Sequence, residues 1–161
     1  MALVRAVERV AEAIMIRGKL PVTFERILVP VDLSDRNGRA LDTALALAQG
    51  SGARVTLLHV IHRVAGLPLV ELRSFYARID KTARTRLARA AKRFADAGLR
   101  VRTEVLVGEP TREIVRSAAR RRVDLIVMGS HRVNPTRPVT GLGTTSYKVT
   151  ALCACPILLV K

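Results

Sequence analysis

Aromatic side chains are scarce in this sequence, since they make up 3% of its 161 residues and tryptophan is absent. A core without them must be built from aliphatic residues, and 49% of the chain is hydrophobic. Abundant Val, Leu, Ile and Ala is typical of parallel strands covered on both faces by helices. The length is that of one domain, large enough to bury roughly 70% of its unfolded surface.

Cysteine and histidine are also few. The two cysteines, Cys153 and Cys155, are one residue apart, a spacing that suits neither a disulfide within a strand nor a tetrahedral metal site. The histidines His59, His62 and His131 lack the clustering with carboxylates or thiols that a metal centre requires. We therefore expect two reduced thiols with a packing role and no metal site formed by the protein alone.

Acidic residues are outnumbered, with 13 Asp and Glu against 28 Lys and Arg, so that the formal net charge is +15. Such a charge attracts nucleotides, nucleic acid or acidic lipid without identifying which. The arginines are scattered along helix-like segments, and no basic run is interleaved with aromatic residues as a base-stacking surface requires. We interpret most of the charge as solvated surface and expect no nucleic-acid partner.

No uninterrupted apolar stretch suitable for a signal peptide or a membrane span is found near the start, because charged residues such as Arg5, Glu8 and Glu12 break it. We expect a cytoplasmic protein. Residues 1–23 show apolar side chains at helical spacing and are predicted to form an N-terminal amphipathic helix or extension. Whether it docks on the domain, contacts a partner or reflects the choice of start site stays open. The domain itself is predicted to span residues 24–161.

Apolar runs typical of strands alternate with segments of helical periodicity along that domain. Strands are predicted over 26–31, 54–61, 99–108, 123–129 and 156–160, and helices over about 40–48, 72–97, from 110, and about 144–152. This alternation predicts an α/β fold: a single-domain, doubly wound five-stranded parallel sheet of order 3-2-1-4-5, with helices on both faces. The wetter strand 99–108 is expected at an edge. Ligands bind such sheets where the strand order reverses, which indicates the loops after the first and fourth strands.

Six short motifs follow one another along residues 24–161: RILVPVDLS, LLHV, VGEP, DLIVMGSH, GTTSYKV and CPILLVK. In this order and at this spacing they resemble the universal stress protein family. The resemblance implies a stress-response or regulatory module that binds ATP or AMP, with Mg²⁺ accompanying ATP. It also implies a homodimer paired through the last strand, Pro156 to Val160.

The glycine-rich loop of the ATP-binding branch of that family reads Gly-x-x-Gly, nine residues, then Gly with Ser or Thr. Gly129 matches the first glycine, and Gly143 with Thr144 matches the last pair. Glycine lets backbone N–H groups approach phosphate, and the last pair opens a helix whose N-terminus favours anions. Arg132 stands where the second glycine is expected, and ten residues instead of nine separate it from Gly143. Arg132 either crowds the nucleotide or offers its guanidinium to phosphate.

Carried over position by position, the resemblance places Asp32 near the adenine or ribose, the backbone of Val60 at the base, and residues 128–131 at the ribose and first phosphate. The expected nucleotide-contacting residues are Pro30, Asp32, Val60, Met128, Gly129, Ser130, His131, Arg132, Gly143, Thr144 and Thr145. Structural roles remain open alternatives: Asp32 as the cap of a turn, His59 as a packed strand residue, and Thr144 as a helix N-cap.

Catalytic residues are not evident in these loops, which offer one carboxylate and no Walker-type lysine, whereas phosphoryl transfer needs a positioned base and a metal-supported charge clamp. At most a slow ATPase is expected. The alternative function is a universal stress protein that has lost nucleotide binding and acts only through protein–protein interaction.

Overall fold

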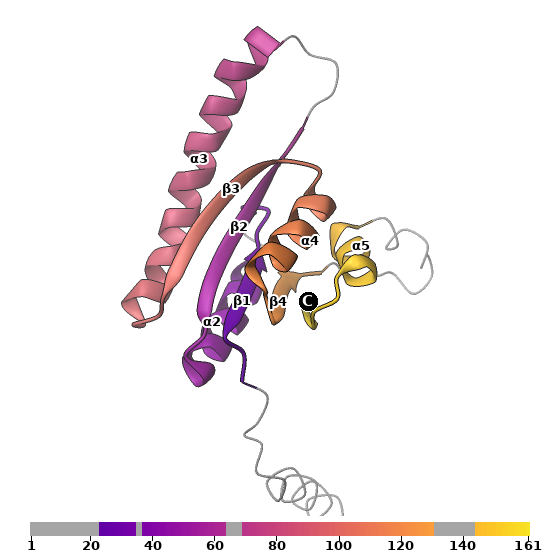
Figure 1. Cartoon of the computed structure of the whole chain (residues 1–161). Helices are drawn as coiled ribbons and strands as arrows, with labels where there is room; N and C mark the ends of the chain where they lie inside the picture. Colours follow the sequence, from indigo (N-terminus) through magenta and orange to yellow (C-terminus); the bar gives the residue numbers. More distant parts are fainter. Residues whose placement is uncertain (1–22, 35–36, 64–68, 131–143) are drawn as a thin grey trace, which may run out of the picture.

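Five strands alternate with four helices in the computed structural model, which describes residues 23–34, 37–63, 69–130 and 144–161 (Figure 1). The elements are β1 (Arg26–Pro30), α2 (Gly38–Ser51), β2 (Arg54–His62), α3 (Leu69–Asp96), β3 (Val101–Gly108), α4 (Pro110–Arg121), β4 (Leu125–Gly129), α5 (Thr145–Leu152) and β5 (Ile157–Val160). The predicted N-terminal extension lies, apart from its last residue, outside the described part of the chain. No helix within those ranges is long and apolar enough to cross a membrane.

The strands form one parallel sheet in the order β3-β2-β1-β4-β5. The predicted doubly wound α/β fold is therefore confirmed, and so is the position of β3 at an edge. The opposite edge is β5. All amino ends of the strands lie at one end of the sheet, which is the lower end in Figure 1, and all carboxyl ends lie at the other.

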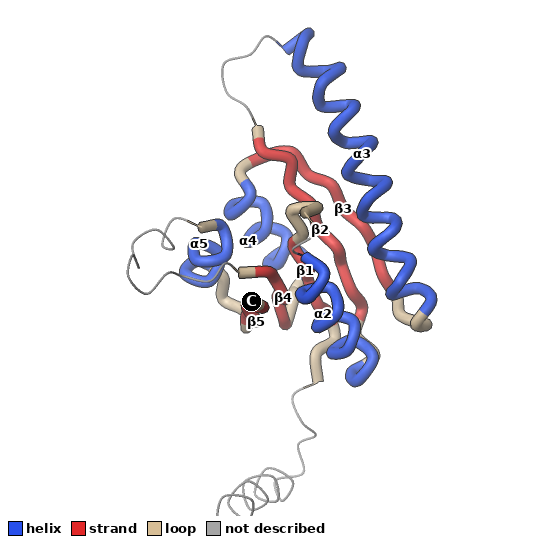
Figure 2. Tube along the Cα trace, turned by 180° about the vertical axis from the view of Figure 1, so that it is seen from behind, coloured by secondary structure: helices blue, strands red, loops and turns tan. Residues whose placement is uncertain are grey.

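Helices cover both faces of this sheet. Helices α2 and α3 pack on one face and α4 and α5 on the other (Figure 2). Neighbouring residues of β1 separate accordingly, because side chains alternate along a strand: Ile27 faces the first core and Leu28 the second. Phe94 of α3 fills the first core, and Val149 of α5 is fully buried in the second. Each such side chain contributes about 1.5–3 kcal/mol by leaving water.

The central strands β1 and β4 pair only at their amino ends, through Ile27 with Leu125 and Leu28 with Ile126. On its other side, β1 stays paired with β2 as far as Pro30. The N–H of Val31 donates to Leu58 of β2 at 2.8 Å, and N–H groups of successive strand residues point to opposite sides. The backbone nitrogen of Pro30 therefore faces β4. Proline has no N–H to donate, and none is needed there because the pairing of β1 with β4 has already ended. The two central strands part here and open a crevice at their carboxyl ends.

Candidate functional site

A cavity of about 420 Å³ occupies this crevice at the point where the strand order reverses. Its walls come from the ends of β1, β2 and β4 and from the first turns of α4 and α5. It is lined by Pro30, Val31, Asp32, Asn37, Leu58, His59, Val60, Pro110, Ile114, Met128, Gly129, Thr144, Thr145 and Ser146. This volume is in the range of small-molecule sites, and the position is the one at which doubly wound sheets bind ligands.

The loop after β1 is held by hydrogen bonds from both sides. The Asp32 carboxylate accepts a hydrogen bond from the N–H of Ser34 at 2.8 Å and another from the side-chain amide of Asn37. Leu33 between them adopts a left-handed conformation with φ 62°, which costs a non-glycine residue roughly 1–2 kcal/mol. Arg86 of α3 donates to the Leu33 carbonyl at 3.0 Å. Asp32 therefore caps this turn, and it lines the cavity at the same time.

His59 bridges the cavity and the loop. Its Nδ1 lies 2.8 Å from the carbonyl oxygen of Val31, and because a carbonyl only accepts, Nδ1 carries the proton. In the neutral ring Nε2 is then an acceptor. The structure thus gives His59 a polar partner beside its packing role, and it also lines a smaller groove against Arg78 and Thr82 of α3.

Gly129 is the last residue of β4 and forms part of the cavity wall. Among the described residues, a Cβ built at this position would meet only the Oδ1 of Asn37, at 3.9 Å. The protein itself thus leaves room for a side chain at Gly129, and that room is part of the cavity. Ser130 follows, and its N–H donates to the Val160 carbonyl at 2.8 Å; it is not among the lining residues.

Two helices begin at the cavity, with caps of different charge. The carboxylate of Glu109 accepts from the N–H groups of Thr111 and Arg112 at 3.1 and 2.7 Å, so a negative charge already sits at the N-terminus of α4. The hydrogen bond from Arg112 is the main cause that lowers the pKa of Glu109. The N-terminus of α5 has a neutral cap, because the hydroxyl of Thr144 accepts from the N–H of Tyr147 at 3.4 Å. An anion in the cavity is therefore attracted to α5 rather than to α4.

Most of the expected site residues come together at this cavity. Those that line it are Pro30, Asp32, Val60, Met128, Gly129, Thr144 and Thr145. His131, Arg132 and Gly143 lie outside the described residues. Sequence reasoning missed Asn37, Leu58, Pro110, Ile114 and Ser146 as lining residues. Only Ser146 carried a usable signal, since it follows Thr144 in the first turn of a predicted helix.

The fold and this cavity define the class of the protein: a doubly wound α/β domain with a ligand cavity at the carboxyl ends of its central strands. The sequence profile of the universal stress protein family matches residues 23–161. The chain belongs to the universal stress protein family.

Individual relatives agree with this assignment. The chain is 30% identical to the universal stress protein YxiE of Bacillus subtilis over 148 residues, which cover 86% of this chain and 99% of the relative. It is similar in structure to the universal stress protein UspA of Lactobacillus plantarum, with a TM-score of 0.74, 25% identity, and coverage of 88% of this chain and 100% of the other.

Two further solved structures of the same fold contain a nucleotide. One is a universal stress protein in complex with cAMP, with a TM-score of 0.66, 23% identity, and coverage of 86% of this chain and 98% of the other. The second is the universal stress protein of Archaeoglobus fulgidus in complex with dAMP, with a TM-score of 0.62, 22% identity, and coverage of 87% and 100%.

Proposed function

We propose that this protein binds an adenine nucleotide, ATP or AMP, in the cavity between β1 and β4 and acts as a stress-response or regulatory module. The cavity carries the proposal, because it combines a small-molecule volume with a glycine wall and a neutral-capped helix N-terminus. The relatives of the same fold that hold cAMP and dAMP support the choice of an adenine nucleotide.

In this proposal the phosphates lie between Gly129 and the first turn of α5, and the base lies toward Val60. The N–H groups of that first turn supply hydrogen-bond donors, and Thr144 and Thr145 add hydroxyls. Asp32 is the single carboxylate that lines the cavity within the described ranges, and in this proposal it lies near the adenine or ribose, where its oxygens can accept hydrogen bonds.

We also propose that the protein acts as a homodimer through β5. This strand is an edge of the sheet, and Leu158 and Leu159 expose 39% and 36% of their surface. An edge strand of this kind presents N–H and C=O groups to another chain. A second copy of the same strand would satisfy both copies at once, as a two-fold axis requires.

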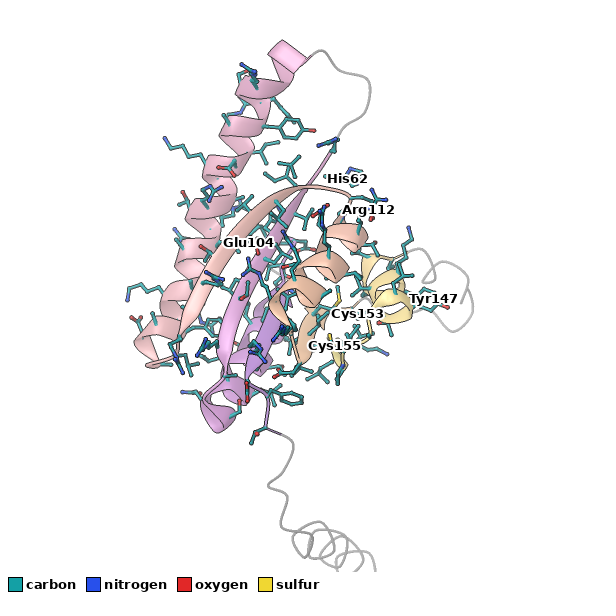
Figure 3. All side chains as sticks on the ribbon, viewed as in Figure 1. His62, Glu104, Arg112, Tyr147, Cys153 and Cys155 are labelled. Carbon is teal, nitrogen blue, oxygen red and sulfur yellow. The ribbon has the colours of Figure 1, made fainter. Side chains whose placement is uncertain are left out.

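We also propose that the protein acts in the cytoplasm, where reductants would keep its two cysteines as thiols. Cys153 and Cys155 are free, with their sulfur atoms 3.3 Å apart (Figure 3). Burial, followed by the hydrogen bond with Cys153, raises the pKa of the Cys155 thiol to about 12. Two thiols this close stay reduced where cytosolic reductants are present.

Nucleotide binding is tested on the purified protein. ATP or AMP at a hundredfold excess over its dissociation constant stabilises the folded state by about 2.7 kcal/mol, so the melting temperature measured by scanning fluorimetry should rise. Mass spectrometry of the freshly denatured protein should also detect any nucleotide that co-purifies. No shift with millimolar ATP, ADP or AMP in the presence of Mg²⁺ would favour the alternative of a module that acts only through protein contacts.

The variant Gly129→Ala sharpens the test. Within the described ranges the added methyl group meets only Asn37, at 3.9 Å, so we expect the fold to tolerate it while the approach of a phosphate is blocked. We expect at least tenfold weaker nucleotide binding by calorimetry. Gly50→Ala is the matched control, because its Cβ meets nothing within 4 Å and Gly50 lies away from the cavity; equal losses in both variants would refute the site.

A further inference from the structure

A second cavity, of about 750 Å³, lies at the amino ends of the strands, the end of the sheet opposite to the nucleotide cavity. It is bordered by the beginnings of β1, β2 and β3, by Val123 before β4, and by the last turns of α3 and α4, at the lower end of the sheet in Figure 1. Among the described residues, no carboxylate lines it. Six arginines do: Arg26, Arg54, Arg100, Arg102, Arg120 and Arg121.

The register of the sheet forces several of these arginines together. Arg26 of β1 is the direct partner of Arg54 of β2. Two residues further along β2, Thr56 is the partner of Arg102 of β3. Neighbouring strands are about 4.8 Å apart, so like charges at these positions repel each other and destabilise the sheet. Folding alone provides no reason to place them there.

Two of the six arginines are neutralised within the protein. Arg121 pairs with Glu104 at 2.6 Å, a half-buried ion pair between α4 and β3 in which Glu104 is labelled in Figure 3. Arg26 lies 3.6 Å from the carboxylate of Glu25. The nearby carboxylate of Asp124 accepts hydrogen bonds from the backbone N–H groups of Glu25 and Arg26.

The other four have no such partner. Within the described parts of the chain, no carboxylate lies within ion-pair distance of Arg54, Arg100, Arg102 or Arg120. For Arg120 a structural reason exists, because cations stabilise the C-terminal turn of a helix such as α4. That reason does not apply to the three arginines at the beginnings of β2 and β3.

Arg54, Arg100, Arg102 and Arg120 are all exposed, so a ligand can reach them from solvent. Apolar residues also line the cavity, among them Leu99 and Val101, which are half-buried. Charge interactions beside such a wall are stronger than in open water, since less solvent screens them. The volume of about 750 Å³ is within the range of small-molecule sites.

We propose that this second cavity binds a compact anion that carries two or more phosphate groups. The planar guanidinium fork matches phosphate oxygens in a bidentate manner, and unpaired arginines from β2, β3 and α4 surround the cavity from different sides. The number of these arginines favours a ligand with more than one phosphate group. The cavity has no aromatic lining residue, so it lacks the stacking surface by which proteins hold single-stranded nucleic acid. This site is independent of the nucleotide proposal.

The test uses the full chain and inorganic tripolyphosphate in isothermal titration calorimetry at about 0.15 M salt, where long-range surface attraction is screened. We expect saturable binding of one tripolyphosphate per chain. The double variant Arg54→Gln/Arg102→Gln should bind at least tenfold more weakly. It should also melt at a higher temperature than the wild type without ligand, because it removes repulsion within the sheet.

A matched control separates a site from net charge. Arg89→Gln/Arg116→Gln removes the same charge from two exposed arginines of α3 and α4 that do not line the cavity, and it should change tripolyphosphate affinity less than threefold. Equal losses in the two double variants, or no binding by the wild type at millimolar tripolyphosphate, would overturn the proposal.

Further ligands identify the source of the phosphates. Orthophosphate should bind far more weakly than pyrophosphate or tripolyphosphate, and equal affinity would contradict the requirement for two phosphate groups. If ATP binds with a stoichiometry of two per chain, and only Arg54→Gln/Arg102→Gln removes the second equivalent, the ligand of this cavity is a nucleotide. If tripolyphosphate binds but ATP shows no second equivalent, the ligand is an inorganic phosphate chain. An oligothymidine that displaces tripolyphosphate and binds more tightly would overturn the proposal in favour of nucleic acid.

Discussion

At the scale of single residues, Arg122 carries backbone strain that a substitution can release. It ends α4 in the left-handed conformation, with φ 50° and ψ 50°, which costs a non-glycine residue roughly 1–2 kcal/mol and which glycine adopts freely. Part of that gain is offset by the larger freedom of glycine in the unfolded chain. We expect Arg122→Gly to raise the free energy of unfolding by about 0.5–1 kcal/mol, measured by urea denaturation.

The exposed Arg116 of the same helix is the control for this prediction. Its position is helical, so Arg116→Gly should lower the free energy of unfolding by about 1 kcal/mol. A destabilised Arg122→Gly protein would show that the strain at Arg122 is absent in solution. The interaction of Arg26 with the Arg122 carbonyl, at 2.9 Å, involves the backbone and survives both substitutions.

At the scale of elements, the N-terminus of α4 depends on Glu109. Its carboxylate accepts two backbone hydrogen bonds, so Glu109→Ala should cost about 1 kcal/mol of stability at neutral pH. The folded state lowers the pKa of Glu109, mainly through the N–H of Arg112. This stabilisation is therefore complete above the unfolded pKa and is lost as the pH falls through the lower, folded pKa.

The pH dependence distinguishes the cap from simple packing. Chemical denaturation at several pH values should show the free energies of unfolding of the wild type and Glu109→Ala converging as the solution becomes acidic. The reason is that a protonated carboxyl is a weaker acceptor for the two backbone N–H groups than the charged carboxylate. A stability difference that stays constant from neutral to acidic pH would contradict the capping role. Glu113→Ala, in the same first turn, provides the comparison for loss of a charge alone.

The elements themselves were predictable, and their ends less so. Nearly continuous apolar runs predicted four of the strands, because burial on two faces imposes such runs, and an alternating pattern predicted the wetter strand at 99–108. β1 ends at Pro30 and not at Val31, and β4 begins at Leu125 and not at Val123. These ends depend on hydrogen bonds to neighbouring strands that no local pattern records.

At the scale of the whole molecule, the open edge of β5 is the predicted dimer interface. The carbonyls of Pro156 and Val160 accept from β4, so the backbone groups of Leu158 also face β4 and those of Leu159 face outward. Leu159→Pro removes a donor from the open edge only. We expect a protein with unchanged far-UV circular dichroism that is monomeric by light scattering, whereas the wild type is dimeric.

Leu158→Pro is the informative counterpart, because it removes a hydrogen bond within the sheet and should lower the melting temperature as well. A wild type that remains monomeric at high micromolar concentration would refute the dimer. A folded Leu159→Pro variant that remains fully dimeric would place the interface on another surface.

Local and repeated patterns in the sequence determined the order of the elements, the parallel sheet and the family of this protein. Residues such as Gly129 and Thr144 were assigned to the site because their types suit phosphate binding. Only the tertiary structure decided which other residues join them: Asn37, the N-cap residue of α2, and Ile114 of α4 reach the same cavity. The same holds for the arginines at the amino ends of the strands, which are scattered in the sequence and become neighbours through the strand register. The physical reason is that composition and periodicity record how each segment is buried, whereas cavities and charge clusters depend on distances between segments that meet only when the sheet is assembled.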